Sequence, residues 1–447
     1  MFRRLLFANF KLLYRFSQRV RQRFTSCGML ILMVIPIAGV FGFDTRSTLS
    51  FQIFSVTLIF LITSMTYTLF FRGRYSIERS LPDYGTVGAP LYYACTVRNN
   101  NGKSKKGLIL IDELKNHYPD VEEFSRVQDP LDKKRNLFDR FIGYPRLVNT
   151  MQKLRGGSIN PVKIEYIAEY SEIDVNIVLN PERRGYLYFD RISLAHADPL
   201  GLFQAKKSFV KNDKLLILPK LIKTPRLDLH GKRTYQHGGI NNASAVGDSQ
   251  EFISLRDYRP GDPLRAIHWR SYAKRGEPVV KEYQDEFFIR YGLILDTYLG
   301  QLSNDLFEDA VTIAASFMTA QNNQDALLDL MFIGNNTYRF TSGRGLASTE
   351  NILEILACIQ PVYDSNIERI QHMIKQHVHE CSALIFILLG FDDMRKELLR
   401  NISKLNLPII ALILTEKSHE YEDEIIGSVK IHYIYHDSLQ TDINNIV

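Results

Sequence analysis

Carboxylates, guanidinium groups and an imidazole are concentrated between Glu251 and Glu286, in the sequence EFISLRDYRPGDPLRAIHWRSYAKRGEPVVKEYQDE. His268 and the acids are residue types that serve as general acids and bases. Each acid here, however, has an Arg or Lys nearby, and a neighbouring guanidinium lowers a carboxyl pKa and makes the group a poor proton donor. We therefore interpret the segment, which holds the only tryptophan, Trp269, as an ion-paired scaffold or a surface that docks a partner.

Nucleic-acid binding is a weak alternative for this segment, because acids interleave with its arginines and lysines and cancel most of the positive field. Arg and Trp are instead the residue types that dominate hot spots between proteins. The residues expected to form the structural and docking core are Arg256, Tyr258, Pro260, Gly261, Asp262, Arg265, Trp269, Lys281 and Glu282. We expect Trp269 to pack within this core and Pro260-Gly261 to form a tight turn that positions Asp262 and Arg265.

Other catalytic patterns are missing from the sequence. There is no G-x-x-x-x-G-K-[ST] and no G-x-S-x-G, which excludes a P-loop and a nucleophile elbow. His372, His377 and His379 precede Cys381 with a spacing that fits no zinc motif, so we expect exposed histidines at a helix end. The four cysteines show no C-x-x-C spacing, which argues against a disulfide framework and suits a reducing compartment.

Two soluble regions must position these residues. Residues 74–222 contain β-branched and aromatic runs bounded by Gly, Pro and Asn, which predicts an antiparallel β-sandwich with an insertion at about 112–157. Residues 223–250 have the composition of a linker, and the charged segment follows at 251–287. In residues 288–447, buried strands alternate with amphipathic helices, which predicts an α/β domain with a mostly parallel sheet.

Two uncharged apolar runs, Cys27 to Phe43 and Thr48 to Phe71, come before these regions. A helix needs roughly 17–25 such residues to cross a bilayer, so residues 27–71 are predicted to form a transmembrane helical hairpin. Residues 1–26 contain seven basic residues and no acid, and Arg72 and Arg74 follow the second run. The positive-inside rule then places both ends, and the soluble domains, in the cytoplasm.

The basic segment 1–26 also intersperses large apolar residues among its arginines, as in Phe10, Leu13 and Phe16. This pattern fits either an interfacial helix on anionic lipid or an ordinary basic flank. The net charge of +6 lies at this membrane end, since the remainder is close to neutral. We expect the hairpin to contact membrane lipid, and we expect no nucleic-acid partner.

The charged segment resembles a large bacterial family, the domain-of-unknown-function family numbered fifty-eight, whose pattern is REYxPGDxxRxIxWxxxAR…VKEFExE followed by a strand that ends in Asp. The matching residues are Arg256-Asp257-Tyr258, Pro260-Gly261-Asp262, Arg265, Ile267, Trp269, Ala273-Lys274-Arg275, Lys281-Glu282 and Glu286. A second family motif, of DPFGLF type, is matched by Asp198-Pro-Leu-Gly-Leu-Phe203. The resemblance implies a C-terminal von Willebrand factor A-like domain over 288–447 and partnership with MoxR-type AAA ATPases.

The von Willebrand A fold can hold a metal at the carboxyl end of its first strand, through a D-x-S-x-S motif whose oxygens suit a hard cation. This chain retains the acid, Asp296, but has Tyr298 and Gly300 at the serine positions. Thr297 and Asp392 are the remaining candidate ligands. Because Tyr298 is too large and Gly300 has no side-chain oxygen, we expect no cofactor, with Mg²⁺ at Asp296, Thr297 and Asp392 as the low-ranked exception.

The sequence therefore predicts a multi-pass protein of the bacterial inner membrane whose soluble domains face the cytoplasm. We expect a non-enzymatic scaffold or adaptor that binds a protein, a MoxR-type AAA ATPase or its client, through the charged segment and the A-like domain. The alternative is a divalent-metal-dependent enzyme or a metal-regulated adhesion module that uses Asp296. A third reading is an envelope-assembly factor whose partner is another membrane protein.

Overall fold

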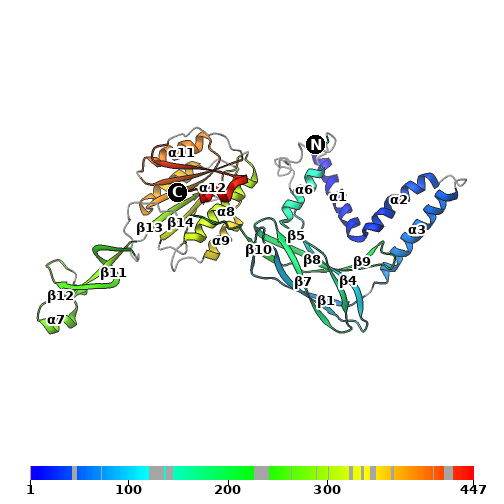
Figure 1. Cartoon of the computed structure of the whole chain (residues 1–447), viewed down its shortest axis with the longest axis horizontal. Helices are drawn as coiled ribbons and strands as arrows, with labels where there is room; N and C mark the ends of the chain where they lie inside the picture. Colours follow the sequence, from blue (N-terminus) through cyan, green and yellow to red (C-terminus); the bar gives the residue numbers. More distant parts are fainter. Residues whose placement is uncertain are drawn as a thin grey trace. The chain divides into compact units, whose positions relative to one another are not determined.

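The computed structural model describes residues 2–42, 48–71, 73–119, 135–136, 144–225, 241–262, 264–287, 289–300, 302–321, 326–333, 337–342, 349–363, 367–405, 407–416 and 426–446. The chain divides into two compact units, Met1–Leu218 and Pro219–Val447. Figure 1 shows helices and two β-sheets in the first unit, and an α/β sheet with a separate two-stranded hairpin in the second.

Three helices open the first unit: α1 (Phe2–Arg23), α2 (Ser26–Gly42) and α3 (Thr48–Leu69). Within the described residues, only Leu49–Leu69 is long and apolar enough to cross a membrane, with a mean hydropathy of 1.7. Helix α2 is apolar but has only 17 residues and contains Pro36. The two helices lie side by side in Figure 1, and the ring of Phe54 packs over Gly39. The structure therefore supports one candidate span of the predicted hairpin by length and composition.

The rest of the first unit consists of two β-sheets that share one apolar core. The first sheet has the order β1 (Tyr75–Ser80), β3 (Leu91–Asn99), β7 (Glu172–Pro181) and β5 (Gly157–Ile159). The second has the order β2 (Tyr84–Thr86), β10 (Lys214–Leu218), β8 (Gly185–Ala197), β4 (Lys105–Leu114) and β6 (Val162–Ile167), with β9 (Gln204–Val210) also on β8.

Side chains of both sheets meet in this core, among them Cys95 from β3, Ile177 from β7 and Phe189 from β8. The alternation of buried and exposed positions along β3, β4 and β7 explains why β-branched and aromatic residues recur at every second position. This two-layered arrangement agrees with the predicted sandwich. Of the predicted insertion, residues 112–114 belong to β4 and helix α6 (Tyr144–Arg155) lies near its end; most of residues 120–143 lie outside the described part.

The second unit contains a six-stranded sheet with helices on both faces (Figure 1). Its order is β15 (Thr337–Ser342), β14 (Ala326–Ile333), β13 (Ile289–Leu295), β16 (Ala383–Leu389), β17 (Ile409–Thr415) and β18 (Val429–Tyr435). All neighbours are parallel except β14 and β15. Its helices are α8 (Asn304–Gln321), α9 (Thr349–Cys358), α10 (Ile367–His377), α11 (Asp393–Ser403) and α12 (Leu439–Asn444).

A two-stranded antiparallel hairpin precedes this sheet and is hydrogen-bonded as a sheet of its own. Its strands are β11 (Asn241–Asp257) and β12 (Val279–Phe287), with a 3-10 turn η2 (Leu264–Ala266) and helix α7 (Trp269–Arg275) between them. The linker predicted over 223–250 thus enters a strand at Asn241, because residues 241–257 pair with the motif's own Val279–Phe287. The charged segment forms the closed end of this hairpin.

Candidate functional site

An ion pair fixes the loop that leaves β11. The Arg256 guanidinium donates to both carboxylate oxygens of Asp262, at 2.7 Å each, and the main-chain N–H of Arg259 donates to Asp262 Oδ2 at 2.8 Å. Gly261 has a φ of 112°, a conformation that side chains rarely adopt, which explains the Pro-Gly sequence of this turn. Asp262 sits in the turn formed by its N–H and the Arg259 carbonyl, as the sequence predicts.

This ion pair has an electrostatic consequence for Asp262. The hydrogen bonds from Arg256 and from the Arg259 N–H lower the pKa of Asp262 to about 2. The carboxyl group is therefore ionised at neutral pH and cannot donate a proton. Its chemistry is that of a structural anchor for the loop.

Backbone hydrogen bonds then tie the rest of the loop to β12. Tyr258 N–H donates to the Pro278 carbonyl at 2.9 Å, and His268 N–H donates to the Val279 carbonyl at 2.8 Å. Ile267 is buried against Val280, with which it forms an isolated β-bridge. The short helix α7 begins directly after this bridge, so the position of its first residue is fixed by the strand beneath it.

The first residue of α7 is Trp269, and 63% of its surface is exposed. Its ring meets the edge of Tyr272 at 6.1 Å between centroids, and Leu264 in the preceding turn is 67% exposed. We call Leu264, Trp269 and Tyr272 the tip surface. The expectation that Trp269 packs within the charged segment is wrong: the ions pair with each other, and the aromatic side chain faces outward.

The remaining motif residues are distributed around the tip surface. Arg265 is exposed, Lys281 is half-buried on β12, and Glu282 lies on the same strand. His268 is half-buried, and its Nδ1 is 2.6 Å from the Ser271 hydroxyl. The structure therefore gathers the predicted residues on one hairpin end, where Arg256 and Asp262 form a side-chain ion pair.

A second candidate lies at the carboxyl end of β13, where a metal was considered. Asp296 is buried, and its Oδ2 accepts from Arg395 Nε at 2.7 Å and from Leu389 N–H at 3.1 Å. Its Oδ1 accepts from Tyr298 N–H at 2.9 Å. The Arg395 side chain, itself 3% exposed, also donates to Asp392 Oδ2 at 2.5 Å and to the Tyr298 carbonyl at 2.6 Å.

The Arg395 guanidinium thus lies between the two carboxylates that were the candidate metal ligands. Thr297, the third candidate, is buried beside them, and its carbonyl accepts from Val362 N–H. Among the described residues, no group of three or more His, Cys, Asp and Glu side chains could hold a metal. Sequence reasoning missed Arg395, although its position three residues after Asp392 places it in the first turn of α11.

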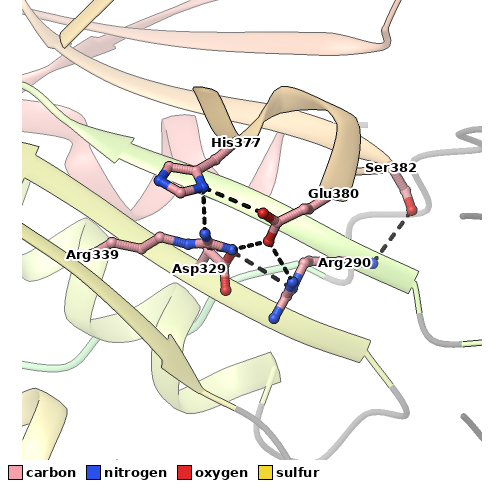
Figure 2. Close-up of polar contacts among 6 residues, drawn as sticks. All are labelled: Arg290, Asp329, Arg339, His377, Glu380 and Ser382. Atoms are coloured by element: carbon pink, nitrogen blue, oxygen red, sulfur yellow. Dashed lines mark hydrogen bonds and ion pairs between the residues drawn. The ribbon is translucent and has the colours of Figure 1, made fainter. Parts of the chain in front are cut away.

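A third polar cluster joins strands β13, β14 and β15 of this sheet to the end of α10 and the 3-10 turn after it, Val378–Glu380 (Figure 2). Asp329 on β14 is fully buried and accepts from Arg339 on β15, at 3.0 Å from Nε and 2.6 Å from Nη2. Glu380 Oε2 accepts from Arg339 at 2.5 Å and from Arg290 of β13 at 2.9 Å. Arg339 Nη1 lies 2.6 Å from His377 Nδ1, so that nitrogen accepts the bond.

This cluster is also poorly suited to acid–base chemistry. The hydrogen bond from Arg339 lowers the pKa of Glu380 to about 2, against the opposing effect of burial. Burial raises the pKa of the neighbouring Cys381 thiol to about 12, which makes it an inert thiol at neutral pH. The prediction of exposed histidines before Cys381 is confirmed for His372 and His379, but His377 is half-buried and its Nδ1 accepts from Arg339.

The second family-like motif, residues 198–203, forms the turn between β8 and β9. Asp198 Oδ1 accepts from the N–H groups of Leu202 and Phe203, at 2.7 and 2.8 Å. The outer side of this turn contacts the start of α2: Thr25 N–H donates to the Leu202 carbonyl at 3.2 Å. A Cβ atom on Gly28 would lie 1.9 Å from that carbonyl oxygen. The motif therefore joins the β-sheets to the apolar helices.

Only part of the chain is similar to the known proteins with which it was compared. Residues 254–432 match the model of the family described as protein of unknown function DUF58. The uncharacterized protein YeaD of Bacillus subtilis (strain 168) is 26% identical over 176 residues, which cover 39% of this chain and 42% of that protein. The match thus spans less than half of that relative's length.

Solved structures add little. The proximal thread matrix protein 1 of the mussel byssus is 10% identical, with a TM-score of 0.27, over 35% of this chain and 44% of that chain. A putative β-galactosidase from Bacteroides fragilis is 8% identical, with a TM-score of 0.15, over 80% of this chain and 42% of that chain. TM-scores this low support no inference about fold or function.

Proposed function

We propose that this chain, which belongs to the DUF58 family through residues 254–432, is a membrane-anchored adaptor that binds a protein partner through its tip surface. The observation that supports this most strongly is the exposure of Trp269, the only tryptophan, at 63%. Trp and Tyr side chains dominate the energetics of protein interfaces.

The hairpin also holds this surface in place before any partner arrives. The Arg256–Asp262 pair fixes the loop, and the His268 N–H bond to Val279 fixes the start of α7. A preorganised surface loses less conformational entropy when it binds, which favours affinity. The ion pairs therefore act indirectly, by positioning Trp269 and its neighbours.

A catalytic role finds less support. In the described part of the chain, Asp262 and Glu380 have pKa values lowered to about 2, which makes both poor proton donors. Burial raises the pKa of Asp296, but its carboxylate is already engaged by Arg395 and by two backbone N–H groups. The alternative, a metal-dependent enzyme that uses Asp296, is less well supported because the Arg395 guanidinium already pairs with this carboxylate.

The proposed partner is a MoxR-type AAA ATPase or its client, as the family resemblance implies. We assign the sheet of the second unit to a von Willebrand factor A-like domain, an assignment supported by its strand order, with β13 central and β15 as the antiparallel edge. In this proposal the A-like domain contributes to the same partner interface as the tip surface.

For the membrane anchor we propose a hairpin of α2 and α3, with both chain ends in the cytoplasm of a bacterium. Helix α3 meets the length requirement, and α2 packs along it. The basic residues of α1 and Arg74 flank the two apolar helices, which favours a cytoplasmic location for both flanks. The protein is then a multi-pass protein of the inner membrane.

Site-specific photocrosslinking in the native membrane tests this proposal. A photoreactive amino acid at the exposed position Leu264 should crosslink an AAA ATPase that mass spectrometry identifies. The crosslink should disappear when Trp269→Ala is added and persist when Tyr92→Ala is added, since Tyr92 is a similarly exposed aromatic residue, 67%, on β3. A crosslink pattern that Trp269→Ala leaves unchanged would reject the tip surface as the interface.

A further inference from the structure

Helix α1 has one apolar face that is buried and a second that is exposed. On one face, Phe10 and Tyr14 are buried against Leu147 and Met151 of α6. Phe10 and Tyr14 are four residues apart, and such a pair lies on one side of a helix. Gln22 accepts from Lys206 of β9 at 3.0 Å. These contacts fix how α1 is rotated about its own axis.

The other face of α1 is apolar and has no neighbour among the described residues that would bury it. Leu12, Leu13 and Phe16 are 63%, 54% and 68% exposed. At 3.6 residues per turn they fall within an arc of about 100°, on the side directed away from Phe10 and Tyr14. Arg19 and Arg23 continue this outer face toward the end of the helix, and both are exposed.

The turn of residues 198–203 places this outer face next to the membrane anchor. Helix α1 ends at Arg23 and α2 begins at Ser26, so the two are separated by Phe24 and Thr25 alone. Phe24 packs edge-to-face on Phe203, at 4.9 Å between ring centroids, and Thr25 is hydrogen-bonded to the Leu202 carbonyl. The end of α1 therefore lies directly beside the start of the apolar helix pair.

We propose that the outer face of α1, formed by Leu12, Leu13 and Phe16, rests on the surface of a bilayer that contains anionic lipid. The proposal rests on the membrane anchoring described above. Exposed apolar side chains would enter the headgroup boundary, and Arg19 and Arg23 would meet lipid phosphates. Helix α1 contains basic residues and no acid. Its uniform positive charge favours an anionic lipid surface over a protein surface that carries charges of both signs.

The unique tryptophan makes a direct test possible. In the full-length protein with Phe16→Trp and Trp269→Phe, the tryptophan fluorescence, excited selectively over that of the tyrosines, reports on position 16 alone. Reconstituted into nanodiscs of phosphatidylcholine and phosphatidylglycerol, this protein should show a blue-shifted tryptophan emission. Brominated lipids should quench most of this emission. The quenching should be weaker with Arg19→Gln and Arg23→Gln, and weaker in nanodiscs of phosphatidylcholine alone.

A companion variant separates the two levels of the proposal. Phe60→Trp with Trp269→Phe places the reporter in the middle of the candidate span, at a residue 45% exposed. Quenching at position 60 without quenching at position 16 would overturn the role of α1 and leave the anchor intact. Quenching at neither position would contradict the anchor itself. Quenching at position 16 that ignores lipid charge and both arginines would overturn the assignment to anionic lipid.

Discussion

Arg395 is the residue that most changes the interpretation of the α/β unit. A buried carboxylate at a strand end needs a positive charge nearby, since an isolated charge in the interior is strongly disfavoured. Asp296 receives it from the Arg395 guanidinium, with which it forms an ion pair at 2.7 Å, both side chains being 3% exposed. An arginine in this place supplies the positive charge that a bound cation would otherwise bring to the strand end.

Replacing Arg395 should therefore strongly destabilise the folded α/β unit. We expect Arg395→Met to lower the free energy of unfolding by about 3–5 kcal/mol, because it leaves the Asp296 carboxylate buried without a partner. Native-state hydrogen exchange of strands β13 and β16 in the full-length protein measures this. Asp392→Asn is the matched control: Asp392 is 45% exposed and Asn preserves the helix cap, so the expected change is below about 1 kcal/mol.

The same measurement examines the metal alternative. A saturating divalent cation at ~100 times its dissociation constant would stabilise the folded state by about 2.7 kcal/mol. We expect millimolar Mg²⁺ to leave the exchange of β13 and β16 unchanged in the unmodified protein. Protection that rises with Mg²⁺ and falls on chelation would restore a metal site at Asp296.

Glu380 gives the α/β unit a defined acid sensitivity. Its pKa falls from 4.5 to about 2 on folding, chiefly through the hydrogen bond from Arg339. A depressed folded pKa contributes stability that is present above pH 4.5 and is lost as the pH falls toward 2. Glu380→Gln should lower the midpoint of urea unfolding, followed at strands β13 to β15, at neutral pH. It should also make this midpoint fall less steeply as the pH decreases from 4.5 to about 2. Parallel acid profiles for both proteins would argue against this contribution.

At the scale of elements, the alternation of strands and helices after residue 288 was predictable. Continuous apolar runs such as ALIFILL and IIALILT are typical of strands buried on both faces, and they form β16 and β17. The short edge strand β15 and helix α12 were missed, because TYRFTS and LQTDIN have little apolar periodicity. Strand β11 was missed because its first half is rich in Asn, Ser and Ala, which are not typical strand residues.

For the candidate site, too, some features could be predicted from the sequence and others could not. Local sequence predicted the turn at Pro260-Gly261 and the pairing of acids with arginines, since these depend on neighbours in the chain. It could not predict the exposure of Trp269 or the encounter of Asp296 with Arg395, which are 99 residues apart. Contacts of this kind depend on the tertiary arrangement of strands and helices.

The turn of residues 198–203 connects two elements, and Gly28 is the position that allows the contact. Gly28→Ala should displace α2 from the turn, because its Cβ would lie 1.9 Å from the Leu202 carbonyl oxygen. Overpacking of this kind typically destabilises by about 1–3 kcal/mol. We expect faster amide exchange from Thr25 to Met29, measured in detergent or nanodiscs.

Gly39→Ala is the matched control for this prediction, since the added Cβ would meet only the Phe54 ring at 3.3 Å. A side-chain ring can shift, whereas a backbone carbonyl held by a turn cannot. Equal exchange at Thr25 in the Gly28→Ala and unmodified proteins would show that the turn does not hold α2.

At the scale of the whole molecule, the chain combines an apolar helix pair, a two-layered β unit and an α/β unit that presents a separate hairpin. The DUF58 match, residues 254–432, covers the hairpin end and most of the α/β unit, and does not extend to the β unit or to helices α1 to α3. The features that we connect with a partner therefore lie within the matched region. The features that we connect with the membrane lie outside it.

We propose Trp269 as the main contact for a protein partner. The most direct measurement is the affinity of the full-length protein, in nanodiscs, for the purified MoxR-type AAA ATPase that we propose as this partner. Removal of a hot-spot tryptophan typically weakens binding by about 2 kcal/mol or more, roughly 30-fold in the dissociation constant. We predict this loss for Trp269→Ala and an unchanged affinity for Tyr92→Ala, and equal affinities for all three proteins, or no binding to any of them, would contradict the account.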